Sequence, residues 1–194
     1  SQQLQWQGKT ITVTGISKGA GMIKPNMATM LGYVATDADI DQALLQSLVS
    51  EAAEQSFNRI TVDGDTSTND ACMLVATGRP VSVSAGSELE ALLRQTVNAV
   101  FLDLAQAIVR DGEGATKFVA VAVKGAQDQQ EALKVAYTVA ESPLVKTALF
   151  ASDPNWGRIL AAIGRAGIDG LDVAKVSVHL DDVLIAERGG RAAS

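Results

Sequence analysis

Apolar and polar residues recur along the chain with two different periods, and these periods predict a mixed order of strands and helices. Short apolar or alternating runs predict strands at residues 8–14, 29–36, 58–63, 71–77 and 117–124, and a hairpin formed by 173–180 and 183–186. Apolar residues at helical spacing predict helices at 40–57, 130–140 and 159–165, a long helix from Ser87 to just before Gly112, and a short helix after Pro143. We therefore expect the α+β (mixed α/β) class.

The helix ends carry local signals of their own. Ser87 and Glu90 form a capping box, in which the two side chains satisfy backbone N–H groups of the first turn. Asp37 or Asp39 can cap the helix at 40–57. The separation of domains is much less marked, and only a weak boundary is expected near residues 150–155.

The composition narrows the classes of function. The chain has 194 residues, of which 47% are hydrophobic and 20% charged, as suits a globular fold. The net charge of −6 argues against a nucleic-acid-binding protein, because such proteins present basic surfaces. No apolar run approaches the length of a membrane span. The single cysteine, Cys72, permits no internal disulfide, which favours a reducing compartment and predicts a cytoplasmic protein.

Three features that could suggest other chemistry have simpler interpretations. A Ser-His-Asp or Cys-His mechanism would have to use the only histidine, His179, which alternates within a predicted strand. Cys72 is interpreted as a small core residue. In DGDTSTND, counted from Asp63, Thr68 and Leu74 stand where a calcium-binding loop needs Gly and Glu. A turn rich in side-chain-to-backbone hydrogen bonds is predicted there, and no metal is expected.

Thr29 stands where a loop-like run of Gly, Pro and Asn meets an apolar strand, with the small Ala28 before it. A hydroxyl at this place can attack the carbonyl of the preceding peptide bond and form an ester that water cleaves. The product is an N-terminal threonine, whose α-amino group has an ordinary pKa of about 7.7 to 8.0. That amine can serve as general base for its own hydroxyl, so the mechanism requires no histidine.

Four segments carry a resemblance to a known family. They are KGAGMIKPNMATMLGYVATDA at 18–38, FNRITVDGDTSTNDA at 57–71, DGEGATKF at 111–118 and SPLVKTALFASDPNWGRILAAIGRAG at 142–167, and together they cover most of the chain. In this order they resemble the ornithine acetyltransferases, also called bifunctional glutamate N-acetyltransferases, of arginine biosynthesis.

The resemblance implies specific roles for four residues. The chain is expected to cleave itself between Ala28 and Thr29, and Thr29 then takes the acetyl group as an ester. Lys18 and Glu113 match residues that contact the substrate. Glu113 also follows the C-terminal end of a predicted helix, where the helix dipole disfavours a carboxylate, and this placement suggests a functional role.

The resemblance also implies an architecture and an assembly. We expect a sandwich of β-sheets flanked by helices, like that of N-terminal nucleophile enzymes, and a heterotetramer of two α and two β chains cut from the precursor. Residues 1–150 are expected to form the catalytic domain, and 151–194 to begin a smaller C-terminal lobe. Members of the family are longer, with an oxyanion-hole Thr-Gly pair upstream and a substrate-contacting tail. We expect this chain to lack both segments.

The expected activity is the transfer of an acetyl group from N-acetylornithine to glutamate through acetyl-Thr29, which gives ornithine and N-acetylglutamate. The substrates are small molecules, no cofactor is expected to be bound, and acetyl-CoA stays open as a second acetyl donor. One alternative is a related self-cleaving aminopeptidase or amidase, which would pass the acyl group to water. The other is a shortened relative without catalytic activity.

Overall fold

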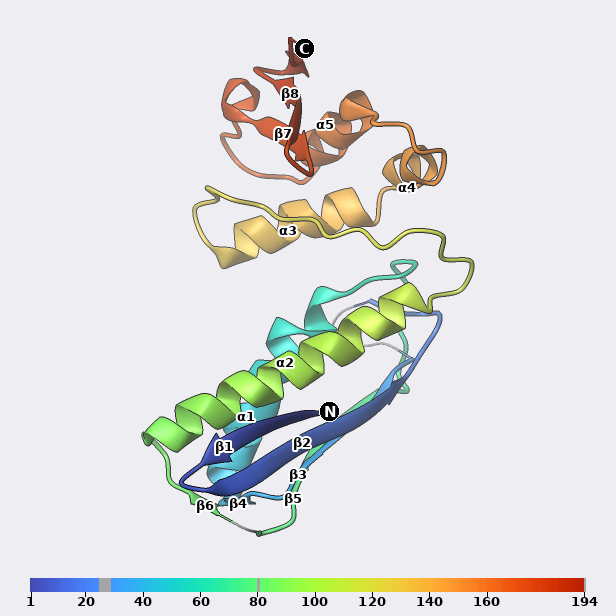
Figure 1. Ribbon diagram of the computed structural model, residues 1–194. Helices are drawn as coiled ribbons and strands as arrows, with labels where there is room; N and C mark the ends of the chain where they lie inside the picture. The colour runs from blue at the N-terminus through green and yellow to red at the C-terminus, as the bar shows by residue number, and fades with distance from the viewer. Residues whose placement is uncertain (25–28, 80, 194) are drawn as a thin grey trace. The chain divides into compact units, whose positions relative to one another are not determined.

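The computed structural model describes residues 1–24, 29–79 and 81–193. The chain divides into two compact units, Ser1–Ala115 and Thr116–Ser194 (Figure 1). This division falls earlier in the sequence than the expected boundary near residue 150, because the helices that precede residue 150 pack with the helix that follows it. The extent of the catalytic domain, residues 1–150, stays a prediction.

The first unit is built on a four-stranded sheet. Its strand order is β1 (Gln2–Trp6), β2 (Lys9–Lys18), β3 (Leu31–Thr36) and β5 (Ala71–Ala76). The first three strands run antiparallel, while β5 lies parallel to β3. A two-stranded ladder joins β4 (Asp39–Ile40) to β6 (Ser82–Val83), and the short 3₁₀ helix η1 spans Phe57–Arg59.

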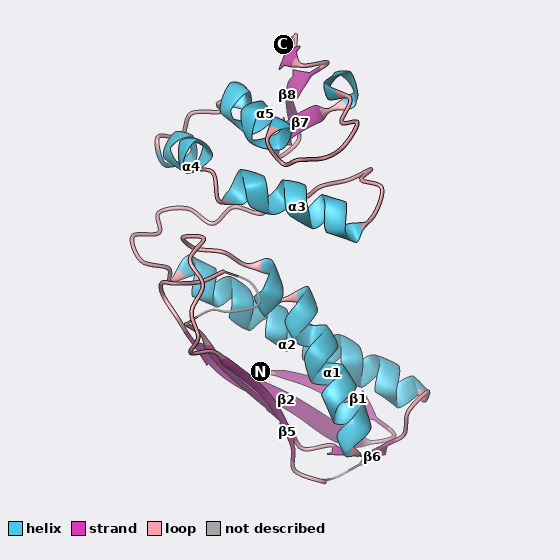
Figure 2. Cartoon of the chain, turned by 180° about the vertical axis from the view of Figure 1, so that it is seen from behind, coloured by secondary structure: helices cyan, strands magenta, loops and turns pink. Residues whose placement is uncertain are grey.

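Two helices, α1 (Gln42–Gln55) and α2 (Glu88–Arg110), cover one face of this sheet (Figure 2). Both begin at a side-chain cap, since Asp41 accepts the N–H of Leu44 and Ser87 accepts that of Glu90. The predicted cap at Ser87 is therefore confirmed. The predicted cap of α1 was wrong, because Asp37 accepts the N–H of Thr12 from β2 instead and Asp39 belongs to β4.

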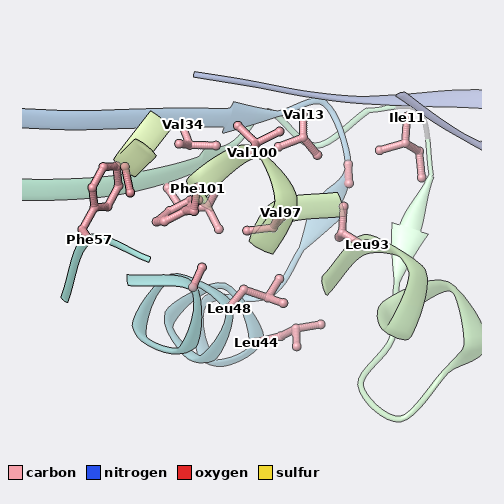
Figure 3. Close-up of a cluster of buried hydrophobic side chains, with 14 of the residues drawn as sticks. Ile11, Val13, Val34, Leu44, Leu48, Phe57, Leu93, Val97, Val100 and Phe101 are labelled. Carbon is pink, nitrogen blue, oxygen red and sulfur yellow. The ribbon is translucent and has the colours of Figure 1, made fainter. Parts of the chain in front are cut away.

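The core of the first unit lies between these helices and the sheet (Figure 3). The buried side chains come from alternate positions of the strands and from one face of each helix; they are Ile11, Val13, Val34, Leu44, Leu48, Leu93, Val97, Val100 and Phe101. Phe57 packs on Phe101 with ring centroids 5.6 Å apart. Each large apolar side chain contributes roughly 1.5–3 kcal/mol when it is fully buried.

The other face of the sheet carries apolar side chains that stay exposed. Ile16, Tyr33 and Met73 lie side by side on β2, β3 and β5, with exposed fractions of 71%, 43% and 50%. The predicted α+β class is confirmed by the order of helices and strands. The packing of two sheets face to face stays a prediction.

The second unit combines three helices with a small sheet. The helices are α3 (Gln129–Ala140), α4 (Pro143–Phe150) and α5 (Trp156–Gly164), and they share a small core of Val139, Val145 and Ala162. After the 3₁₀ helix η2 (Val173–Lys175) come the antiparallel strands β7 (Ser177–Leu180), β8 (Val183–Glu187) and β9 (Gly190–Arg191). Among the described residues, no helix is long and apolar enough to cross a membrane.

Several segments differ from the sequence prediction, among them the start of the predicted hairpin, where residues 173–175 form η2 and β7 begins only at Ser177. Residues 58–63 form no strand: η1 and a loop replace it, and Ile60 and Val62 pack against the core from there. Residues 117–124 also form no strand, because no described segment pairs with them. The unpredicted β1 is joined to β2 by a tight turn in which Gln7 and Gly8 have φ of 48° and 77°, as hairpin turns require.

The close approach of α2 to β2 depends on Gly15. A Cβ added there would lie 2.8 Å from Val34 Cγ2, 2.9 Å from Leu104 Cδ1 and 2.9 Å from the carbonyl oxygen of Tyr33. We expect Gly15→Ala to lower the free energy of unfolding by about 1–3 kcal/mol, because the strand and the helix must move apart. Urea unfolding followed by circular dichroism measures this change.

The matched control is Gly164→Ala, since an added Cβ there meets nothing within 4 Å and the residue is helical. It should leave stability unchanged or raise it slightly, as Ala favours the helix. Wild-type stability in Gly15→Ala would contradict the proposed tight contact.

Candidate active site

Thr29 lies in the loop two residues before strand β3, whereas the predicted strand at 29–36 began at Thr29 itself. Its backbone N–H donates to the carbonyl oxygen of Met22 at 2.8 Å. Its hydroxyl Oγ1 is buried and makes no hydrogen bond with any residue that the structure describes. A buried hydroxyl normally finds a partner, so one without any is a candidate functional group. Ala28, the other residue of the predicted cleavage site, lies outside the described residues.

The turn that holds the Thr29 nitrogen is itself held by Asp63. The Asp63 carboxylate accepts the N–H of Met22 at 2.7 Å through Oδ2 and the N–H of Ile23 at 3.2 Å through Oδ1. Met22 has a φ of 51°, a left-handed conformation that residues other than glycine adopt rarely. The buried Ile23 also accepts the N–H of Val62 at 2.9 Å. The turn is therefore fixed on both sides by residues 62 and 63.

Glu113 reaches the same turn from the end of α2. Its backbone N–H donates to the carbonyl oxygen of Ala20 at 2.9 Å. Its carboxylate lies against Gly21, where an added Cβ would meet Glu113 Cδ and Oε1 at 3.1 Å each. The absence of a side chain at Gly21 therefore leaves room for the carboxylate, which is exposed to solvent.

Lys18 is the last residue of β2, and its Cα partner across the ladder is Leu31 of β3, two residues after Thr29. The side chain of Lys18 is exposed. The structure thus places Lys18 opposite Leu31, at the start of β3, and Glu113 against the turn at Ala20 and Gly21. Their roles stay predictions, as does that of Thr29.

The segment DGDTSTND was predicted to form a turn, and its link to Thr29 was not predicted. The turn is confirmed, because Asp63 accepts the N–H of Asp65 and Ser67 accepts that of Asn69. Among the residues that the structure describes, no group of three His, Cys, Asp or Glu side chains could hold a metal ion. Asp63 was missed as a functional residue because its contact with Met22 spans 41 positions and leaves no periodic signal in the sequence.

Cys72 and His179 are poor alternatives to Thr29 as reactive groups. Cys72 packs partly buried against the core, and burial, assisted by the charge of Asp70, raises the pKa of its thiol from 9.0 to about 11. Almost no thiolate is then present near neutral pH. His179 is an exposed residue of β7, beside a bulge in the ladder with β8. Its predicted position on a strand is confirmed.

The model of the ArgJ family matches residues 1–194. The chain belongs to the ArgJ family. It is 66% identical over 197 aligned positions to the arginine biosynthesis bifunctional protein ArgJ of Pseudomonas fluorescens, covering 100% of this chain and 49% of that protein. It is 62% identical over 195 positions to the ArgJ protein of Pseudomonas syringae pv. tomato, covering 99% of this chain and 48% of that protein.

A crystal structure of the ArgJ protein from Bacillus halodurans shares the fold. The two chains superpose with a TM-score of 0.80 at 39% identity, over 86% of this chain and 78% of that one. The ArgJ relatives from Pseudomonas are longer, so this chain spans about half of their length. The family resemblance derived from the four sequence segments is therefore confirmed.

The raised pKa of Cys72 predicts slow alkylation. At pH 8 a thiol with a pKa of about 11 has a thiolate fraction on the order of 100-fold lower than a thiol with a pKa of 9.0. Iodoacetamide should therefore modify Cys72 on the order of 100-fold more slowly in the folded chain than in the urea-unfolded chain. Intact mass against time measures both rates. Equal rates would contradict the burial of the thiol.

The same shift affects stability in the alkaline range. The Cys72 thiol holds its proton more tightly in the folded chain than in the unfolded chain. Its contribution to the free energy of unfolding is therefore complete below pH 9.0 and is lost as the pH rises towards about 11. Cys72→Ser, whose hydroxyl does not titrate in this range, is the control.

Proposed function

We propose that this chain carries the nucleophile of an acetyltransferase that moves an acetyl group from N-acetylornithine to glutamate. The observation that carries the proposal is the buried Thr29 Oγ1, which lacks a hydrogen-bond partner among the described residues while its own nitrogen is held by Met22. Thr61 Oγ1 is buried without a partner as well. Of these two threonines, however, Thr29 is the one that lies just before a strand and within the segment that resembles the family's cleavage region.

Self-cleavage supplies the catalytic amine. Thr29 Oγ1 bonds to the carbonyl carbon of the preceding residue, Ala28, and the carbon–nitrogen bond breaks as the Thr29 nitrogen takes up a proton. Water then hydrolyses the resulting ester, which leaves a carboxylate on Ala28 and a free α-amino group on Thr29. This amine can accept the proton of the neighbouring hydroxyl, so the chemistry needs neither histidine nor metal.

Transfer then proceeds in two steps. Thr29 Oγ1 attacks the acetyl carbonyl of N-acetylornithine, its proton passes through the α-amine to the departing nitrogen, and ornithine leaves. The amine of glutamate attacks the acetyl ester, the ester oxygen recovers a proton, and N-acetylglutamate leaves. The same acetyl-Thr29 can form from acetyl-CoA, with a thiol as leaving group, and no bound cofactor is required.

Lys18 and Glu113 suit a substrate that carries both a positive and a negative charge. Glu113, whose carboxylate lies beside Gly21, is proposed to bind the ammonium group of ornithine. Lys18, at the end of β2, is proposed to bind a substrate carboxylate. Because the ArgJ relatives are about twice as long, we propose that the complete site and a cytoplasmic heterotetramer of two α and two β chains involve further polypeptide.

The first test is the mass of the purified chain. Wild type should separate into two pieces, the second beginning Thr-Met-Leu-Gly-Tyr, and should gain one acetyl group on Thr29 with N-acetylornithine. Thr29→Ala should stay intact and unacetylated because it has no hydroxyl. Thr29→Ser keeps the hydroxyl and should cleave and acetylate, at a different rate.

Glutamate separates the proposed transferase from the alternatives. It should accelerate the loss of acetyl-Thr29 and appear as N-acetylglutamate. Loss of the acetyl group at the same rate with and without glutamate would indicate a hydrolase. A wild-type chain that stays whole and unacetylated on long incubation would overturn the proposed activity of this chain.

Glu113→Gln tests substrate binding apart from processing. We expect the KM for N-acetylornithine to rise at least about tenfold, as a charged partner of the ammonium is lost. Self-cleavage should keep its rate, because the backbone N–H of Glu113 still holds Ala20. Asp111→Asn, the exposed residue at the end of α2, is the charge-matched control and should behave as wild type. An unchanged KM in Glu113→Gln would refute the assigned contact.

A further inference from the structure

We infer that Asp63 is a positioning residue for Thr29: its carboxylate fixes the turn at Met22 and Ile23, and the Met22 carbonyl in turn holds the Thr29 nitrogen. We call Asp63, Met22 and Ile23 the turn clamp. The structural part of this inference rests on contacts alone, and its catalytic consequence rests on the proposed function.

Both oxygens of the Asp63 carboxylate are used by backbone donors. Oδ2 accepts the N–H of Met22 at 2.7 Å, while Oδ1 accepts those of Ile23 at 3.2 Å and Asp65 at 3.0 Å. A carboxylate has two acceptor oxygens and can accept all three of these N–H groups. An amide has one acceptor oxygen, and its NH₂ group would face one of the donors. The negative charge also strengthens each hydrogen bond.

The clamp holds a conformation that the turn would not keep alone. Met22 has a φ of 51°, which is unfavourable for a side chain with a Cβ, and the residue is exposed. Ile23 differs, because its side chain is buried at 1% exposure and its carbonyl accepts the N–H of Val62. Loss of the Asp63 carboxylate therefore leaves Ile23 anchored in the core and releases Met22. Met22 is the residue that contacts Thr29.

The geometry of the Thr29 nitrogen matters for the proposed chemistry. Before cleavage this nitrogen is the leaving atom of the peptide bond, and afterwards it is the amine that receives the proton of Oγ1. The hydrogen bond from the Thr29 nitrogen to the Met22 carbonyl oxygen fixes the orientation of this nitrogen, including, after cleavage, the direction of its lone pair. Among the described residues, the Asp63 carboxylate accepts hydrogen bonds from the N–H groups of residues 22, 23 and 65, and not from Thr29, Lys18 or Glu113. A change at Asp63 should therefore alter turnover more than substrate binding.

The structural test uses hydrogen exchange in a chain that cannot cleave. In the Thr29→Val background the amide at position 29 is retained and the nucleophile is absent. Adding Asp63→Asn should accelerate exchange of the amide at 22 by about tenfold or more, through loss of its hydrogen bond to a charged acceptor. The amide at 29 should exchange faster as well, because the Met22 carbonyl that accepts it is released. Core amides such as those of Val34 and Val97 should keep their protection.

Asp65→Asn is the matched control. Among the described residues its side chain makes no hydrogen bond, and only its backbone N–H donates to Asp63, so exchange at position 29 should stay as in the parent. Asp63→Ser, whose single oxygen can satisfy fewer donors, provides a second variant should Asp63→Asn fail to fold. Unchanged exchange at position 29 would overturn the inference, as would loss of protection at Val34 and Val97 in both Asp63 variants.

The catalytic test uses chains with Thr29 intact. Asp63→Asn should slow self-cleavage and lower kcat by at least about tenfold, with the KM for N-acetylornithine within about twofold of wild type. A merely structural role would lower the fraction of active chains, counted by the acetyl-enzyme burst, and leave the rate per active chain unchanged. That result would also overturn the inference.

The two tests separate this inference from the proposed function. Faster exchange at position 29 in the Asp63 variant, together with a wild-type chain that neither cleaves nor acetylates, would support the clamp and refute the proposed activity. A wild-type chain that cleaves and transfers, with Asp63→Asn matching it in rate, would support the activity and refute the clamp.

Discussion

The packing of α2 across the sheet is the constraint on which the rest of the first unit depends. The apolar face of this helix packs on β1 and β2, and Gly15 lets the helix approach closely, because an added Cβ there would lie 2.9 Å from Leu104 Cδ1. The same contact brings the end of the helix to the turn before Thr29. Glu113 follows α2 directly and bonds Ala20 through its backbone N–H. One hydrophobic contact therefore both stabilises the unit and places the Glu113 carboxylate beside Gly21, in the turn that holds the Thr29 nitrogen.

Much of this arrangement could be predicted from the sequence, where short-range rules decide the structure. The long helix was predicted at both ends, since Ser87 caps it and Gly112 lies just past it. Strand β1 was missed because the run QQLQW has only two apolar side chains. Residues 58–63 have the alternation of a strand, yet Ile60 and Val62 serve to cover the core from a loop. The alternation of apolar and polar residues indicates which side chains face the core, but it does not indicate which hydrogen bonds the backbone makes.

The candidate site shows the same limit more clearly. Thr29, Lys18 and Glu113 were found because each stands in a segment that resembles the family. Asp63 also stands in such a motif, DGDTSTND, but its importance comes from a pairing with Met22 that only the folded chain reveals. A carboxylate that bonds distant backbone N–H groups does not differ in sequence from one that closes its own turn. Asp63 does both, and only the local part could be predicted.

The pairing of β2 with β3 determines what the proposed cleavage would do to the structure. Six residue pairs, from Val13 with Thr36 to Lys18 with Leu31, join these strands, and the bond before Thr29 lies in the connection between them. Once that bond is cut, the ladder becomes a contact between two polypeptides. The β1–β2 hairpin would then belong to one chain of the product and β3 to the other, and Lys18 would pair with Leu31 across the contact between the two chains. Strands β2 and β3 would therefore stay paired after the covalent link between them is cut.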